Sequence, residues 1–209
     1  MVLSLTLRGG DSSPRRVSRI SLSWQILDSM SRYLPIEWQT RLAKSMPWAI
    51  DDLIKLRPCT GDDAPILVQL YADPDVRRLI GRPLAPTIDE TRNVIDTRRD
   101  VMSSYYIVER LDAAAAVGCA AFLRNDFIND VDILIALLPQ HRRKNYGSQI
   151  LERMRKAWID ELKNDHCTVT VQPNNDAARK VLAKCGFRQS GEYTNKCAVT
   201  SLIYRYPQS

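Results

Sequence analysis

The residues of this chain that are best suited to chemistry lie in one basic turn, which follows the longest apolar run, residues 133–138. A helix is expected to begin directly after the turn, and the unpaired backbone amides at a helix N-terminus attract anions. Three cations, a hydroxyl and a glycine that permits close approach to the main chain accompany those amides. The combination predicts a pyrophosphate-binding site, and a solvated basic turn is the alternative. The residues concerned are Arg142, Arg143, Lys144, Tyr146, Gly147 and Ser148.

This turn resembles the acyl-CoA loop of the GNAT N-acetyltransferases, whose pattern is Arg/Gln-x-x-Gly-x-Gly/Ala. The chain carries Arg142, Asn145 and Gly147 at the three defined positions. Asn145 thus replaces the usual glycine, and asparagine is the non-glycine residue that best tolerates a positive φ. We expect Asn145 to keep the loop conformation, although its side chain would crowd the pyrophosphate and weaken cofactor binding.

Two further segments are similar to the same family and follow in the expected order. Residues 171–187 resemble its strand–Asn–helix–Gly-Phe element, which implies that Asn175 binds the pantetheine arm and that Ala178 is the small residue beside it. Residues 56–77 resemble the RimJ/RimL branch, in which Arg-Pro and Asp-Pro-x-Val-Arg recur. The resemblance extends over about residues 53–206.

The resemblance implies an α/β fold with a mixed, mostly antiparallel central sheet, a splayed pair of parallel strands and helices on both faces. It also implies acetyl-CoA as the cofactor, bound in the gap of the splayed pair, and a primary amine as the acceptor. The strand at 133–138 would offer backbone groups to the pantetheine at Ile135 and Leu137, as an added strand does. Lys180 would meet a CoA phosphate, and a solvated lysine is the alternative.

Amine acetylation needs a base for the amine proton and an acid for the leaving thiolate. Many GNAT enzymes use as the acid a tyrosine seven residues after the pantetheine asparagine, where this chain has Leu182. For the base we select Asp132, because a carboxylate between apolar neighbours is expected to have a raised pKa; the alternative is an aspartate bonded to nearby backbone. Asp126 and Asp130 would attract a cationic amine or form plain turns. His141 is expected to face solvent.

Strands and helices that are recognisable from hydrophobic periodicity must position these residues. The clearest is a helix over residues 146–163, whose apolar residues recur at every fourth position. Gly186 is expected to end the last helix in a left-handed conformation, and Cys119 and Cys185 are expected in the core. The expected strands are residues 53–56, 105–109, 117–123, 132–138, 167–171 and 199–206, and the expected helices are 60–73 with a further turn through Leu79, 88–99, 146–163 and 176–185.

Composition narrows the class of protein. The 209 residues are 44% hydrophobic and 26% charged, which is typical of a soluble globular chain. The longest apolar run is far shorter than the about 20 residues that a membrane helix needs, and the run at 2–7 lacks the basic residues that precede a secretory signal. Two histidines exclude a multi-histidine metal site, and five widely spaced cysteines argue against a zinc site or a disulfide framework. We therefore expect a reducing, cytoplasmic location.

We divide the chain into an N-terminal extension, residues 1–50, and an acetyltransferase domain, residues 51–209. The extension carries seven Arg or Lys against three acidic residues, so most of the net charge of +6 belongs to it, and nucleic-acid binding by the main domain is disfavoured. Residues 1–19 are expected to be disordered and residues 20–46 to form two short amphipathic helices. Three roles stay open: an organelle transit peptide, an arm for a membrane surface or a partner, or an extension packed on the main domain.

The predicted function is the transfer of an acetyl group from acetyl-CoA to a primary amine of a protein or small molecule, by direct attack in a ternary complex. The alternative is a degenerate GNAT domain that binds CoA or a protein, motivated by Asn145 and Leu182. Neither the acceptor nor the oligomeric state, with a homodimer among the options, follows from the sequence. Met30 and Met46 are alternative starts of the chain.

Overall fold

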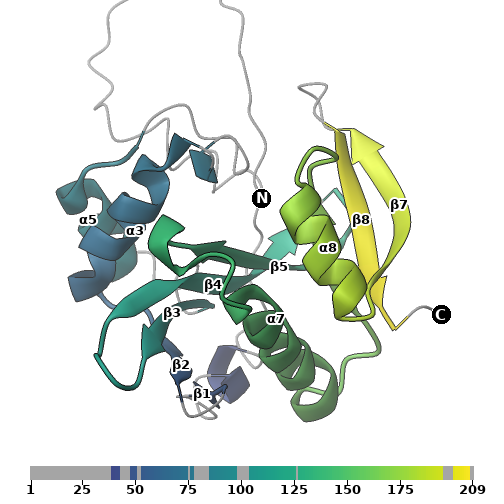
Figure 1. Ribbon diagram of the computed structural model, residues 1–209, viewed down its shortest axis with the longest axis horizontal. Coiled ribbons are helices and arrows are strands. Elements are labelled where there is room, and N and C mark those ends of the chain that lie inside the picture. Colours follow the sequence, from purple (N-terminus) through teal and green to yellow (C-terminus); the bar gives the residue numbers. More distant parts are fainter. Residues whose placement is uncertain are drawn as a thin grey trace, which may run out of the picture.

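The computed structural model describes residues 39–42, 48–50, 53–74, 76–77, 85–97, 104–125, 127–194 and 200–207. These residues form one eight-stranded sheet in the order β1-β2-β3-β4-β5-β6-β8-β7, with helices packed against it (Figure 1). The strands are β1 (Trp48–Ala49), β2 (Ile54–Pro58), β3 (Tyr105–Arg110), β4 (Ala116–Asn125), β5 (Asp130–Leu137), β6 (Cys167–Val171), β7 (Arg188–Thr194) and β8 (Thr200–Tyr206). The α-helices are α3 (Ala64–Ala72), α5 (Ile88–Thr97), α7 (Tyr146–Lys156) and α8 (Asp176–Lys184).

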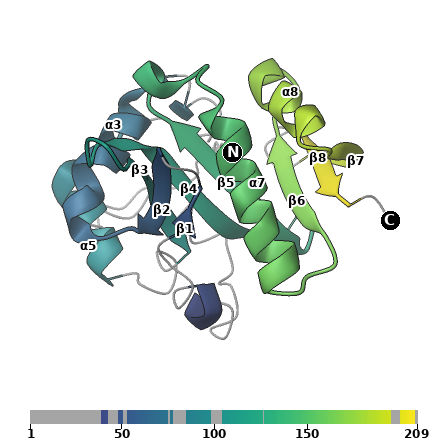
Figure 2. The same ribbon diagram turned by 60° about the horizontal axis from the view of Figure 1, so that its bottom comes forward.

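Helices cover both faces of the sheet (Figures 1 and 2). α7 and α8 pack on one face and α3 and α5 on the other, so that two hydrophobic cores lie on opposite sides of the strands. β3 contributes to both, because side chains alternate along a strand: Tyr106 and Val108 belong to the first core, and Tyr105 and Ile107 to the second. The arrangement confirms the mixed α/β fold class predicted from the sequence.

β5 is joined unequally to its two neighbours. Eight of its residues pair with antiparallel β4, from Asp130 opposite Asn125 to Leu137 opposite Gly118. On the parallel neighbour β6, only Thr168 has a register partner, which is Asp132. The other neighbouring strands are all antiparallel. β5 and β6 are therefore the splayed parallel pair that the family resemblance implied.

The sequence predicted six strands and missed two edge strands. β7 reads Arg-Gln-Ser-Gly-Glu-Tyr-Thr, and none of its residues is buried, so it lacks the apolar alternation by which strands are found. Antiparallel pairing with β8 holds it in place. β1 is only two residues long, and its Trp48 packs against Tyr106 with ring centroids 5.6 Å apart.

The helix predicted over residues 146–163 is a regular α-helix only over Tyr146–Lys156. It continues as a π-helical turn over Ala157–Glu161, in which the amide of Leu162 donates to the carbonyl five residues earlier at 3.0 Å. Such a turn holds one extra residue, and a four-residue apolar repeat does not reveal it.

Part of the segment predicted as an N-terminal extension packs into the core of the domain. Residues 39–42 are helical, and Leu42 and Trp48 are 1% and 2% exposed in the same core as α7. The Arg41 guanidinium donates to the carbonyl of Glu161 at 3.2 Å. These contacts favour an extension packed on the main domain, while the boundary at residue 50 stays a prediction.

Some predictions fall on residues that the structure does not describe. They are the disordered start and most of the amphipathic helices within residues 1–46, the part of the turn through Leu79 that follows residue 77, residues 98–99 of the second helix, Asp126, and Val199 at the start of the last strand.

Candidate functional site

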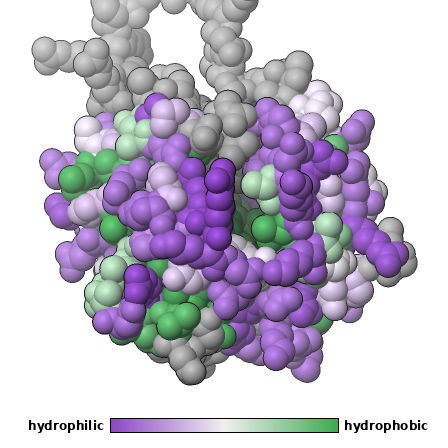
Figure 3. Space-filling view, in the orientation of Figure 1, coloured by the Kyte–Doolittle hydropathy of each residue, from purple (hydrophilic) through white to green (hydrophobic). Residues whose placement is uncertain are grey.

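The diverging strands leave an opening in the middle of the sheet. Ile135, Ala136 and Leu137 on β5 are only half-buried, although residues 131–134 are buried. A central strand between two helical layers is normally buried along its length. Figure 3 shows a hollow in this face of the molecule, with hydrophobic side chains between hydrophilic rims. The C-terminal half of β5 therefore has an edge that an extended ligand can reach.

Asp132 lies at the narrow end of the opening and is 8% exposed. One carboxylate oxygen accepts the backbone amide of Thr170 at 2.8 Å, and the other accepts the Thr170 hydroxyl. Asn125 donates a longer bond of 3.4 Å to the second oxygen. Burial raises the pKa of the Asp132 carboxyl to about 6, and the bonds from Thr170 and Asn125 limit the rise. Asp132 thus combines the backbone bond of a structural aspartate with the raised pKa that a base requires.

A tyrosine that the sequence reasoning missed lies at the same end of the opening. Asn125 also donates to the Tyr193 hydroxyl at 3.4 Å, and the Tyr193 ring stacks on Phe127 with centroids 5.3 Å apart. Tyr193 comes from β7, the edge strand without a periodic signal, so no local pattern connected it to Asp132. Thr170 was also missed, because a threonine in an apolar strand has no distinctive sequence signal.

The predicted anion-binding turn lies at the wide end of the opening. A 3₁₀ turn, Pro139–His141, follows β5, and a short loop then leads into α7. Asn145 is the N-cap of α7 and has a φ of 66°, the left-handed conformation expected of a residue that replaces glycine. Arg143 has a φ of 61°, which the sequence did not reveal. The side chain of Asn145 makes no capping bond to the first amides of α7, which leaves these amides as candidate donors to an anion.

The three cations of this turn are placed differently. Arg142 forms an ion pair with Asp73, the residue that ends α3, and its Nε donates to the carbonyl of Leu137 at 3.1 Å. The side chains of Arg143 and Lys144 are exposed. Arg142 is therefore already bonded within the protein, whereas Arg143 and Lys144 extend toward solvent. Asp73 lies 69 residues from Arg142 in the chain, and no local signal linked the two.

A lysine of α8 reaches the loop from the other side of the opening. Lys184 donates its Nζ to the side-chain oxygen of Asn145 at 2.7 Å. Lys180, the α8 lysine selected from the sequence, is exposed one turn earlier on the same helix. The loop is thus flanked by positive charge from α8 in addition to its own cations.

Gly147 is not required by the fold. Its φ is not left-handed, and a Cβ built there would lie 4.0 Å from its nearest neighbour, a methyl group of Val181. Tyr146 is half-buried beside His141, at 6.4 Å between ring centroids, and Ser148 is 7% exposed. Neither backbone conformation nor packing explains a glycine at 147, so the space beside the first turn of α7 is left for something outside the chain.

The second segment selected from the sequence brings Asn175 to the start of α8. Its side-chain oxygen accepts the amide of Ala178 at 3.2 Å and so caps the helix. Its side-chain nitrogen makes no hydrogen bond within the part of the chain that the structure describes, and two donors remain for a ligand. Leu182, at the position of the family's tyrosine, is 2% exposed in the core.

Other reactive groups near the opening are poorly suited to catalysis. Cys119, Cys167 and Cys185 are buried, and burial raises the pKa of each thiol, which disfavours the nucleophilic thiolate. Cys119 and Cys185 are thus core residues, as predicted. His141 was expected to face solvent but is half-buried, and burial lowers its pKa. The described residues hold no cluster of three or more metal-ligating side chains and no helix long and apolar enough to cross a membrane.

Comparison with known protein sequences points to one family. Residues 54–188 match the family described as the acetyltransferase (GNAT) domain. The chain is also similar to an uncharacterized N-acetyltransferase of Bacillus subtilis (strain 168), YoaA, at 21% identity over 145 residues, which are 67% of this chain and 82% of that protein.

Solved structures show the same fold. An acetyltransferase (GNAT family) from Bacillus anthracis is similar with a TM-score of 0.65 and 21% identity, covering 77% of this chain and 97% of that one. Spermidine N-acetyltransferase from Vibrio cholerae, in complex with CoA and spermine, has a TM-score of 0.63 and 15% identity, covering 74% of this chain and 95% of that one.

Proposed function

The chain belongs to the GNAT acetyltransferase family, and on that premise we propose that it transfers an acetyl group from acetyl-CoA directly to a primary amine in a ternary complex. The observation that carries the proposal is the opening beside β5, which has Asp132 at its narrow end and the uncapped start of α7 at its wide end. One end suits a proton acceptor, and the other suits an anion.

The described residues fit acetyl-CoA along the whole opening. The half-buried edge of β5 at Ile135 and Leu137 suits the amides of a pantetheine arm. The side-chain nitrogen of Asn175 can donate to a carbonyl of the same arm, because only the side-chain oxygen of Asn175 is used in capping α8. The amides at the start of α7, with the cations around them, suit the phosphates. Acetyl-CoA bound there supplies the activated acetyl thioester. The phosphate-binding groups in this proposal are Arg143, Lys144, Asn145, Tyr146, Gly147, Ser148 and Lys180.

Asp132 is the base in this proposal. A carboxyl with a pKa of about 6 is mostly ionised at neutral pH and still binds a proton more readily than an ordinary aspartate does. Because its oxygens already accept bonds from Thr170, it takes the amine proton through a water. Leu182 offers no proton, so water also serves as the acid.

We assign the chain to the RimJ/RimL-like branch of the family. The Arg-Pro and Asp-Pro segments that suggested this branch both make ion pairs here, Arg57 with Asp63 and Asp73 with Arg142. The acceptor we propose is an amine of a protein or of a small molecule. A polyamine is the first small amine to test, because a similar structure was solved with spermine.

The second candidate is a degenerate acetyltransferase domain that binds CoA or a protein without turnover. The contact between Lys184 and Asn145, 2.7 Å, favours it, because the asparagine side chain stays in the loop where the family has a glycine. Leu182 favours it as well, since it provides no proton donor.

Binding and turnover with acetyl-CoA separate the two candidates. The melting temperature and the calorimetric affinity of the purified chain are measured with acetyl-CoA, dephospho-CoA and buffer. A ligand that binds only the native state raises the melting temperature by mass action. A panel of amines, including spermine and peptides with free N-termini, is then screened by detection of the released thiol. No stabilisation at millimolar acetyl-CoA would overturn the proposed acetyl transfer and leave the second candidate as a protein-binding domain. Stabilisation without thiol release from any amine would favour the second candidate as a CoA-binding domain.

Two substitutions in α7 test the site itself. Gly147→Trp fills the open space beside the first turn of the helix, so we expect acetyl-CoA binding to be lost while the fold survives. Lys156→Trp is the matched control, since Lys156 is exposed at the far end of the same helix. Equal affinity in the two variants would contradict the assignment of the loop.

A further inference from the structure

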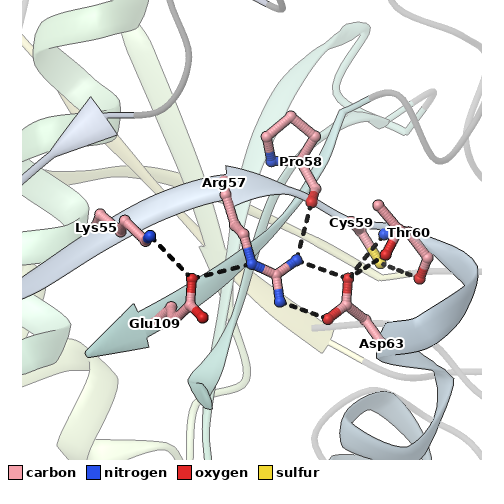
Figure 4. Close-up of polar contacts among 7 residues, drawn as sticks. All are labelled: Lys55, Arg57, Pro58, Cys59, Thr60, Asp63 and Glu109. Atoms are coloured by element: carbon pink, nitrogen blue, oxygen red, sulfur yellow. Dashed lines mark hydrogen bonds and ion pairs between the residues drawn. The ribbon is translucent and has the colours of Figure 1, made fainter. Parts of the chain in front are cut away.

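The helix α3 is held at both ends by ion pairs of the same type, and only one of them reaches the proposed cofactor site. At its start, the Arg57 guanidinium donates two bonds to the Asp63 carboxylate, at 2.7 and 2.8 Å (Figure 4). Asp63 also accepts the backbone amide of Thr60 at 2.8 Å, and Arg57 Nε donates to Glu109 at 3.1 Å. This end of the helix is thereby fixed to β2 and β3.

At the other end, Asp73 leaves the helix with extended backbone angles and forms an ion pair with Arg142. The Asp73 side chain is 11% exposed and that of Arg142 is 34% exposed. The second contact of Arg142, from Nε to the carbonyl of Leu137, spans the turn that follows β5. Arg142 thus connects α3, the end of β5 and the start of the loop.

The loop needs such a connection because its backbone is strained. Arg143 and Asn145 both have positive φ, which non-glycine residues adopt at a cost in energy. Strained residues of this kind persist only where the surroundings hold them in place. Each is accompanied by a side-chain anchor: Arg142, directly before Arg143, is bonded to Asp73, and Asn145 itself is bonded to Lys184.

We propose that Asp73 is a positioning residue for acetyl-CoA binding, which holds the strained loop in its binding conformation through Arg142. Arg142 in this proposal is a structural link and not a ligand of the phosphates. The effect on affinity for acetyl-CoA rests on the proposed function, whereas the structural link between Asp73 and Arg142 does not. A phosphate-binding role for Arg142 predicts the opposite result: if Asp73 restrained Arg142 from binding the phosphates, removal of the Asp73 charge would tighten acetyl-CoA binding.

Hydrogen exchange in the ligand-free protein tests the link directly. Asp73→Asn removes the charge with little change of shape, and Asp63→Asn, at the other end of α3, is the matched control. We expect the backbone amides of residues 143–148 to exchange at least fivefold faster in Asp73→Asn than in wild type. Asp63→Asn is expected to lower the melting temperature and to leave those amides unchanged. If Asp63→Asn does not fold, Glu109→Gln replaces it, since it weakens only the contacts of Glu109 with Arg57 Nε and Lys55 Nζ and keeps the two bonds from Arg57 to Asp63.

Affinity for acetyl-CoA then tests the consequence. Asp73→Asn is expected to weaken binding at least fivefold and to raise the KM for acetyl-CoA while kcat changes little. In an Arg142→Gln background the Asp73→Asn effect should disappear, because both changes remove the same link. Unchanged exchange in Asp73→Asn, or tighter binding, would overturn the proposal. Faster exchange in a chain whose wild type does not bind acetyl-CoA would instead overturn the proposed function and leave the link intact.

Discussion

The two edges of β5 are held by different kinds of bonds. On the β4 side, eight residues of β5 are in register, and backbone hydrogen bonds close the edge along its length. On the β6 side a single position is in register, and carboxylates make the further contacts: Asp132 to Thr170, and Asp130 to the Thr168 hydroxyl and His166 Nε2, both at 2.7 Å.

The two kinds of bond explain how an opening can exist inside a continuous sheet. Backbone bonds of the β4–β5 type tie neighbouring strands together at every step. Side-chain bonds join two strands at one end and leave the other end apart. Because side-chain bonds depend on single residues and on a titratable carboxylate, the open edge is more sensitive to pH and to single substitutions than the backbone-bonded edge is. The following predictions test this comparison, beginning with the largest expected effect.

Gly118→Ala should disrupt the closed edge. A Cβ at Gly118 would lie 2.1 Å from the carbonyl oxygen of Ala136, and backbone cannot move aside as a side chain can. We expect a loss of about 3 kcal/mol or more in the free energy of unfolding, measured in urea. Gly191→Ala on the edge strand β7 is the control, because its Cβ would meet only a methyl of Ile203 at 3.7 Å. Equal effects of the two changes would refute the close contact.

The open edge should lose stability as the pH rises. The pKa of Asp132 is about 6 in the folded protein and about 4 in an unfolded chain, so the native state binds more protons between those values. The contribution is fully present below pH about 4 and is lost as the pH rises through about 6, and it amounts to about 3 kcal/mol. Urea unfolding of wild type and Asp132→Asn across pH 4 to 8 isolates it, since the variant cannot titrate at this position. Parallel curves for the two proteins would show that Asp132 has an ordinary pKa.

Thr170→Val should weaken the same edge without removing the carboxylate. The change deletes the hydroxyl bond to Asp132 and keeps the backbone amide bond at 2.8 Å. We expect a loss of about 1 kcal/mol at pH 7, measured by urea unfolding. Thr194→Val, which removes an exposed hydroxyl contact at the tip of the β7–β8 hairpin, should cost less. A larger loss for Thr194→Val would mean that Thr170 does not secure the edge.

Tyr193→Phe should have the smallest effect on stability. It removes only the hydroxyl that accepts the 3.4 Å bond from Asn125, and the stacking of ring 193 on Phe127 is retained. We expect a change below about 0.5 kcal/mol in unfolding free energy, because the bond is long and partly exposed. A fall of tenfold or more in kcat with unchanged stability would instead place the hydroxyl in the reaction.

Local patterns in the sequence predicted much of the secondary structure. Continuous, mostly apolar stretches predicted the strands around 105–109 and 117–123, and apolar residues on one face predicted the helices that became α7 and α8. The positive φ of Gly186 followed from its residue type and its place at a helix end, and that of Asn145 followed from the resemblance to the family's loop, in which it replaces a glycine. These features depend on residues close together in the chain, and the sequence therefore determined them directly.

The contacts that give the opening its character were decided by the tertiary structure. Asp132 and Thr170 are 38 residues apart, Asn145 and Lys184 are 39 apart, and Asp73 and Arg142 are 69 apart. The edge strand β7 has no apolar period, and only its pairing with β8 brings Tyr193 to Asn125. The sequence determined which side chains carry charge and where the backbone turns. Which carboxylate meets which donor depends on the packing of distant elements, because side-chain bonds form only between groups that the fold has already brought within reach.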